Sequence, residues 1–248
     1  MRHLTIIWNW GLRLIVYVFL APVLLHALVW SAHGWPASWR DADWSSAGIL
    51  ASPAQVQEAT VRIYSARTGG WKGIFATHSW IVVKRTGASH YDRYDVVGWG
   101  NPVRKNAYQA DGKWYGNTPD LTFATDGPNA EMLIPKVEAA IAAYRWSRRG
   151  DYAIWPGPNS NTFVATVLAK VPELDVRLPP TAIGRDFPAD GNWTGRTPSG
   201  GFRLTAGGYA GVVAGPEEGL ELNFLGLVTG VDFLKPAIKI PGFGRLGL

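Results

Sequence analysis

One serine and one histidine of this 248-residue chain lie in surroundings that suit acyl-transfer chemistry. Ser160 follows two prolines and a glycine in the stretch Trp155–Phe163, which predicts an irregular turn and then a helix capped by Asn159 or Ser160. At a helix N-terminus, the backbone N–H groups of Ser160 and Asn161 could stabilise a developing negative charge. Apolar residues recur every four positions in this helix, which Pro172 would end: Phe163, Val167 and Val171.

A serine hydroxyl becomes a useful nucleophile only when a base takes its proton. His78 lies inside the apolar stretch 73–84, which is typical of a strand, and could serve as that base. The following strand brings residues 94–96 opposite His78, so Asp95, or else Asp92 or Tyr94, could orient the imidazole. The structural alternative is also open: Ser160 only caps its helix, and His78 is a hydrogen-bonded histidine of the core.

The composition indicates one globular domain with appendages and excludes several kinds of site. Hydrophobic residues make up 47% of the chain and charged residues 17%, which suits a sizeable core. The net charge of +5 is not gathered into a basic stripe with aromatic residues, so we expect no nucleic-acid partner. With no cysteine, the chain has no disulfide, thiolate metal ligand or cysteine nucleophile. Neither a metal-ligand spacing nor a phosphate-binding glycine loop occurs, so we expect no metal and no cofactor.

Residues 1–34 form a membrane anchor or a signal peptide. The run Leu14–Trp30 is apolar apart from one histidine, and flanking residues could complete a membrane span. Arg2 and Arg13 precede the run, so the positive-inside rule predicts a cytoplasmic N-terminus with the remainder of the chain outside the cytoplasm. The small-x-small tripeptide at 32–34 could be a signal-peptidase site, but we favour a retained single-pass anchor.

The rest of the chain divides into a linker, a domain and an extension. Residues 35–57 contain Pro, Ser and Ala and predict a linker, whereas residues 58–188 predict an α+β domain with an antiparallel sheet packed on helices. Residues 189–248 alternate glycines with apolar residues and predict a β extension. Within the domain we expect strands at 59–64, 73–84 and 91–97, a hairpin at 108–115, and a helix over 135–146 with its proline in the first turn.

Two short motifs resemble the permuted branch of the papain-like superfamily. Asn159-Ser160-Asn161-Thr162-Phe163 is similar to the Asn-Cys-Asn-x-Phe of the deSUMOylating isopeptidases, and His78-Ser79-Trp80 is similar to their histidine strand. The branch also includes permuted relatives of the NlpC-type peptidases and the lecithin-retinol acyltransferase-like proteins. The resemblance implies a permuted papain-like core in which His78 is the base and Ser160 replaces the nucleophilic cysteine. Serine has a far higher pKa than cysteine and therefore needs a well-built base and oxyanion hole.

A longer series of motifs resembles a bacterial envelope family known only as a domain of unknown function. The series comprises residues 71–82, 94–100, 114–117 and 155–163, and Leu178–Gly184 continues it, so the likeness covers about residues 58 to 186. The resemblance implies that serine is the family's usual residue at position 160. With the orientation predicted from Arg2 and Arg13, we expect an inner-membrane protein whose C-terminal domain lies in the periplasm. The resemblance brings no known activity.

Two functions fit these features. The first is a Ser–His hydrolase acting on amides or esters of cell-envelope material, with Ser160 as nucleophile, His78 as base and Asp95 as the orienting residue. The second is a catalytically inactive binding module, or a structural subunit of an envelope or membrane protein complex. In that case the same cleft would bind an envelope glycan, peptide or lipid. The candidate binding residues are Trp80, Trp99, Trp155, Asn159 and Asn161.

Overall fold

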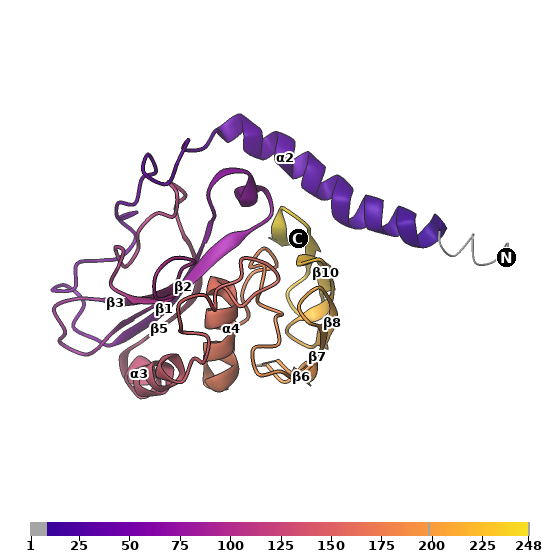
Figure 1. Ribbon diagram of the computed structural model, residues 1–248. Coiled ribbons are helices and arrows are strands. Elements are labelled where there is room, and N and C mark those ends of the chain that lie inside the picture. The colour runs from indigo at the N-terminus through magenta and orange to yellow at the C-terminus, as the bar shows by residue number, and fades with distance from the viewer. Residues whose placement is uncertain (1–8, 198, 248) are drawn as a thin grey trace.

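The computed structural model describes residues 9–197 and 199–247, which form two antiparallel sheets, their helices and one long N-terminal helix. Arg2, on which part of the predicted orientation rests, lies outside the described residues. Figure 1 shows the first sheet and its helices on one side of the molecule, the C-terminal strands on the other, and the N-terminal helix running above both. The predicted α+β class with an antiparallel sheet is therefore confirmed.

The first sheet has five strands in the order β4-β3-β2-β1-β5, and every neighbouring pair is antiparallel. Its two central strands are rich in β-branched and aromatic residues and are buried on both faces. Two helices, α3 (Gly127–Ala142) and α4 (Ser160–Lys170), cover one face, and the short 3-10 helix η3 (Pro172–Leu174) follows α4. The strands are β1 (Thr60–Arg67), β2 (Thr77–Lys84), β3 (Asp92–Val96), β4 (Val103–Lys105) and β5 (Asp120–Asp126).

Alternation along β1 and β2 divides the core of this domain into two clusters. Ile63 and Ile81 are cross-strand partners and pack with the residues of α3 and α4. Tyr64 and Trp80 are the neighbouring pair and point to the opposite face, where they belong to a second cluster against which Trp44 packs through Trp114. Through Trp44, the segment 35–57 takes part in covering this second face of the sheet.

The C-terminal part of the chain forms a second sheet of seven strands in the order β12-β11-β10-β9-β8-β7-β6. Each strand pairs with its neighbour in sequence, so the sheet is an antiparallel meander joined by short turns that are rich in glycine. The strands are β6 (Thr194–Arg196), β7 (Phe202–Ala206), β8 (Ala210–Gly215), β9 (Gly219–Phe224), β10 (Leu227–Asp232), β11 (Ala237–Ile240) and β12 (Gly244–Gly247).

The N-terminal helix, Asn9–His33, is long and apolar enough to cross a membrane. It also contacts the rest of the protein. The ring centroids of Phe19 and Phe224 lie 5.5 Å apart, which joins the helix to the C-terminal sheet. Further along, Trp30 Nε1 donates a hydrogen bond of 3.1 Å to a carbonyl of the 3-10 helix η2 (Gly70–Ile74). The helix contains the π-helical segment η1 (Ile15–Leu20) and the α-helical segment α2 (Ala21–His33).

The predicted helix over 135–146 is misplaced, because α3 runs from Gly127 to Ala142 and contains Pro135 in its interior. A proline inside a helix removes one backbone hydrogen bond. Burial of the apolar face of α3 against the first sheet compensates for this loss, and that burial depends on tertiary contacts that the local sequence does not reveal. The buried residues of the helix are Ala130, Leu133, Ile134, Val137, Ala140 and Ile141.

The predicted hairpin at 108–115 is also wrong. Residues 106–117 form turns, and the bridges in this segment join Trp114 to Asn117 and Ser46 to Gly112. The Asp111 carboxylate does not support a hairpin. It accepts hydrogen bonds from the Ser46 hydroxyl at 2.7 Å and the Ile49 backbone N–H at 2.9 Å. The segment therefore ties the chain before β1 to the second face of the first sheet.

The backbone at Gly219 provides a test of the C-terminal sheet. This glycine has a φ of +64°, and an added Cβ would lie 1.9 Å from the Val231 carbonyl oxygen. Gly87 has a φ of +67° with nothing within 4 Å of an added Cβ. We expect Gly87→Ala to cost about 1–2 kcal/mol of unfolding free energy from the left-handed backbone alone. Gly219→Ala should cost about 1–3 kcal/mol more through overpacking.

The measurement is urea unfolding of the full chain in detergent micelles, followed by tryptophan fluorescence. Equal losses for the two variants would show that β9 and β10 are not packed as described.

Candidate functional site

The histidine and the aspartate predicted to act together are hydrogen-bonded partners on neighbouring strands. His78 Nε2, on β2, lies 2.8 Å from Asp95 Oδ1, on β3. Arg93 holds the same carboxylate through two bonds, Nε to Oδ2 at 2.7 Å and Nη2 to Oδ1 at 3.0 Å. The Arg93 guanidinium in turn lies 3.9 Å from the ring centroid of Trp80. All four side chains are buried, so this is a satisfied polar cluster inside an aromatic environment.

Burial controls the protonation of the pair. Desolvation lowers the pKa of His78 below its ordinary value, although the Asp95 carboxylate acts in the opposite direction. Burial alone would raise the pKa of Asp95, but the charge of Arg93 and the bond to His78 lower it. His78 is therefore neutral at pH 7, donates its Nε2 proton to Asp95, and keeps Nδ1 as an acceptor. Its ring stacks on Trp114 with the centroids 3.7 Å apart.

Ser160 is the first residue of α4, and Asn159 is its N-cap. Asn159 Oδ1 accepts the backbone N–H groups of Asn161 at 3.0 Å and Thr162 at 3.1 Å. The N–H of Phe163 donates to the Asn159 carbonyl. Of the two groups predicted to stabilise an oxyanion, the N–H of Asn161 is thus already engaged by the cap.

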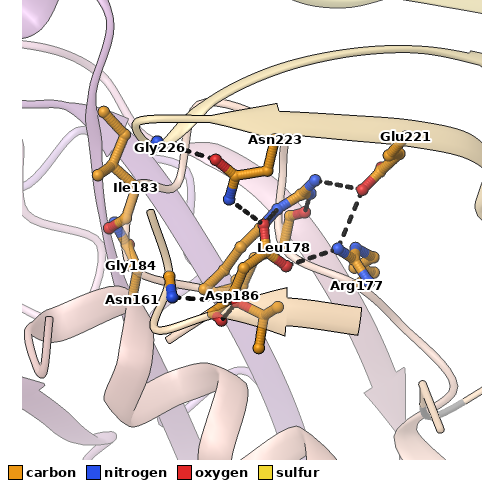
Figure 2. Close-up of polar contacts among 12 residues, drawn as sticks. Asn161, Arg177, Leu178, Ile183, Gly184, Asp186, Glu221, Asn223 and Gly226 are labelled. Carbon is orange, nitrogen blue, oxygen red and sulfur yellow. Dashed lines mark hydrogen bonds and ion pairs between the residues drawn. The ribbon is translucent and has the colours of Figure 1, made fainter. Parts of the chain in front are cut away.

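The start of α4 docks on the open edge of β2. β2 pairs with β3 only over Ile81–Val83, so its first residues have no β3 partner along this edge. There Asn161 Nδ2 donates to the Thr77 carbonyl at 2.8 Å and to the Ile183 carbonyl, also at 2.8 Å. Figure 2 includes Asn161 and Ile183 beside the polar contacts of the C-terminal sheet. The Asn161 side chain therefore joins α4 to β2 and to the segment that follows η3.

Ser160 and His78 lie on two elements that touch, but no hydrogen bond joins them among the described residues. The helix–strand contact that does form uses the residues next to them, Asn161 and Thr77. Ser160 is 4% exposed and His78 is 5% exposed. A substrate would have to displace protein atoms to reach either side chain in this arrangement.

The tryptophans predicted to line one binding cleft are not gathered together. Trp80 is completely buried beneath Arg93 and takes part in the core. Trp99 and Trp155 are 52% and 44% exposed, and Trp155 Nε1 donates to the Leu225 carbonyl at 3.0 Å. The Trp155 ring therefore joins the first domain to the C-terminal sheet.

A buried ion network, which the sequence did not suggest, joins the first domain to the C-terminal sheet (Figure 2). At its centre, Glu221 of β9 contacts Arg185 at 2.5 Å, Lys239 at 2.7 Å and Arg177 at 3.0 Å. Burial would raise the pKa of Glu221, but the three cations outweigh it and lower the pKa to about 2. Arg177 also contacts Asp186 at 2.8 Å. The carboxylate of Glu221 is thus charged at any physiological pH.

Next to this network lies a cavity of about 340 Å³ between α4, the segment after η3 and strands β6 and β7. Arg177 and Arg185 each present an Nε that is buried without a hydrogen-bond partner among the described residues. Within the described part of the chain, the other cations of the lining bond only to backbone carbonyls. We name this the cationic cavity: its charged lining is Lys170, Arg177, Arg185, Arg196 and Arg203, against Asp186 and Asp190.

The buried imidazole makes stability depend on pH. Because the pKa of His78 is lowered in the folded protein, the unfolded chain binds a proton on this imidazole at pH values at which the folded chain does not. Stability is therefore full above about pH 6.5 and falls as the pH decreases below it, by at most about 1.4 kcal/mol per pH unit. His78→Gln, which keeps a donor for Asp95, should remove this slope between pH 7 and 5. Chemical unfolding of the full chain at each pH measures it.

The control is His90→Gln, since His90 lies in an exposed turn. It should leave the slope unchanged. Parallel stability profiles for the wild type and His78→Gln would contradict the buried, neutral state of His78.

Comparison with known proteins assigns the family and nothing further. No curated protein matches the chain, and neither does any solved structure. A family described as a protein of unknown function, DUF3750, matches residues 58–187. The match runs from just before β1 to just beyond Asp186, so it contains both the His78–Asp95 pair and the start of α4. Because it covers more than half of the sequence, the chain belongs to the DUF3750 family.

Proposed function

We propose that this protein is a membrane-anchored binding module that holds a small anionic ligand in the cationic cavity. The observation that carries the proposal is the surplus of cationic side chains in that cavity. Arg177 and Arg185 are balanced by Glu221 and Asp186, but the three other cations of the lining face Asp190 alone. Among the described residues, Lys170, Arg196 and Arg203 have no acidic partner within salt-bridge distance, and each donates to a backbone carbonyl. Guanidinium groups match carboxylate and phosphate groups in shape and charge.

The ligand would carry an apolar part as well as the anionic group. The cavity is lined on its other sides by apolar side chains, among them Leu168, Val176 and Phe187. This combination suits a phosphate or carboxylate attached to a short apolar body. Envelope glycans, peptides and lipids of the bacterial periplasm all offer such groups. Arg13 and the apolar helix support an anchor in the inner membrane with the domain in the periplasm.

In this proposal the papain-like motifs have a structural role. The burial of Ser160 and His78, and the use of the Asn161 N–H by the cap, leave little of the apparatus that a serine nucleophile requires. The strands β2 and β3, which carry His78 and Asp95, precede the helix that starts at Ser160, and this is the order that the papain-like resemblance implies. We infer that the core is a papain-like scaffold whose former nucleophile position now fixes a helix to a strand.

One observation favours the second candidate, a Ser160–His78 hydrolase. The bond from His78 Nε2 to Asp95 leaves Nδ1 free to act as a base, and the lowered pKa keeps that base neutral at pH 7. Ser160 lies on the element that docks beside this strand. A motion that opens the edge of β2 would be needed to bring the hydroxyl to Nδ1.

The anionic ligand is tested with inorganic phosphate. We expect phosphate to raise the melting temperature of the full chain in detergent, relative to chloride at equal ionic strength, because a ligand that binds only the folded state stabilises it. Lys170→Gln and Arg203→Gln should each reduce this rise. Arg149→Gln, in a loop that does not line the cavity, should leave it unchanged.

Two outcomes would overturn the anionic-ligand proposal. Either phosphate gives no stabilisation beyond that of chloride, or all three variants respond to phosphate as the wild type does.

Catalysis is tested separately by labelling the purified protein with a fluorophosphonate probe, which reacts with activated serines. The proposal predicts no labelling of the wild type, because the hydroxyl of Ser160 is buried and has no base within hydrogen-bond distance among the residues that the structure describes. Ser160→Ala and heat-denatured protein are the controls. Labelling of the native wild type that disappears in Ser160→Ala would favour the hydrolase instead.

A further inference from the structure

The C-terminal sheet has its apolar side outward. Glu221, Lys239 and Asp232 point toward the first domain or are buried within the ion network, so the alternate residues of the same strands point away. Strand pairing places six of these outward residues side by side across β7 to β12. The first row is Phe202, Ala214, Leu220, Val231, Ile238 and Leu246.

Two further rows lie parallel to the first and have the same character. One is Leu204, Val212, Leu222 and Thr229, and the other is Ala206, Ala210, Phe224 and Leu227. Thr229 carries the one polar side chain of the three rows, which we call the outer face, and its hydroxyl donates to the Lys239 carbonyl at 3.2 Å. Large members of the outer face are exposed, for example Phe202 at 51% and Leu204 at 43%. An apolar surface of this extent is not typical of a protein face in water.

The N-terminal helix meets the sheet on this same side. Phe224, with which Phe19 is in aromatic contact, belongs to the outer face. In Figure 1 the N-terminal half of the helix extends past the C-terminal strands, away from the first domain. A bilayer that contains this part of the helix therefore lies on the side toward which the outer face points.

We propose that the outer face contacts the hydrocarbon of the bilayer that the N-terminal helix crosses. A lipid partner fits the face better than a protein partner, because its three rows over β7 to β12 offer no free hydrogen-bonding side chain and protein interfaces normally include several. Polar residues continue the rows only on the edge strand β6, where Thr194 pairs with Leu204 and Arg196 with Phe202. The interior strands β7 to β11 are paired on both sides within the meander, as a membrane environment requires, and the outer edges of β6 and β12 would lie at the lipid headgroups.

The edge of the sheet has the residues expected at the lipid headgroups. The turn between β10 and β11 exposes Phe233 and Leu234 beside Lys235, whose side chain is 81% exposed. Trp193, at the start of β6, is 61% exposed, and Arg245 of β12 is on the opposite edge. Aromatic and cationic side chains of this kind favour the membrane–water interface and anionic lipids.

This inference rests on the membrane anchoring in the proposed function, but not on the anionic ligand. It is tested with the complete chain, in which any introduced cysteine is unique because the native sequence has none. A nitrobenzoxadiazole dye is attached to Leu222→Cys on the outer face, to Leu25→Cys on the N-terminal helix, or to Met132→Cys on α3. Each native side chain is exposed, so labelling does not disturb the core. The proteins are reconstituted into vesicles of phosphatidylethanolamine and phosphatidylglycerol.

We expect the dye at residues 222 and 25 to emit several-fold more strongly than the dye at residue 132. Nitroxide lipids should quench the first two, and iodide in the aqueous phase should quench only the third. If the dye at 25 is in lipid while the dye at 222 behaves like that at 132, the inference fails and the anchoring stands. If both are in water, the anchoring fails as well. If the dye at 222 is reached by neither quencher, a second copy of the chain covers the face, which also overturns the lipid contact.

Discussion

The arrangement of the two sheets depends on the burial of one carboxylate. Glu221 lies in the middle of a strand, and its charge is tolerable there only because Arg177, Arg185 and Lys239 surround it. Two of these cations belong to the first domain. The C-terminal sheet can therefore satisfy its charged face only by placing it against that domain. The apolar face of the sheet is then left to point outward.

Asp95 has a related role inside the first sheet. The backbone pairing between β2 and β3 ends at Ile81 and Tyr94 and does not continue toward His78. The bond between His78 and Asp95 bridges the gap, while Arg93 supplies the charge that keeps the carboxylate ionised. The start of α4 docks on the part of the β2 edge that has no β3 partner. The His78–Asp95 pair resembles a catalytic pair, and it also holds β2 and β3 together beyond the end of their backbone pairing.

The local features of the domain were readable from the sequence. The strand around His78 and the helix beginning at Ser160 follow from apolar spacing, a capping Asn and flanking prolines, and the structure has both. The proximity of Asp95 to His78 follows from the register of adjacent strands. The family likeness over residues 58–186 is confirmed by the match to 58–187.

The long-range features could not be read in this way. Arg185 and Glu221 are distant in sequence, and nothing local indicates that they meet. The strand pattern Leu220-Glu221-Leu222 shows clear alternation, but alternation does not say which side is buried. Leucines are usually buried and glutamates exposed. Here Glu221 is buried, whereas Leu220 and Leu222 are exposed. A proline in a helix usually lies in the first turn. Pro135 lies in the interior of α3 instead, and only the packing of that helix on the sheet explains its position.

Because the ribosome makes the N-terminal helix first, this helix could also protect the C-terminal strands while they fold. The strands with the apolar outer face emerge last, and a newly made strand of this kind readily pairs with another unfolded chain. If the helix crosses a membrane as proposed, it is already inserted by then, and it touches the sheet through Phe19. Each nascent chain would then complete its last strands beside its own patch of lipid, and separate insertion points would keep neighbouring copies apart until the meander has closed.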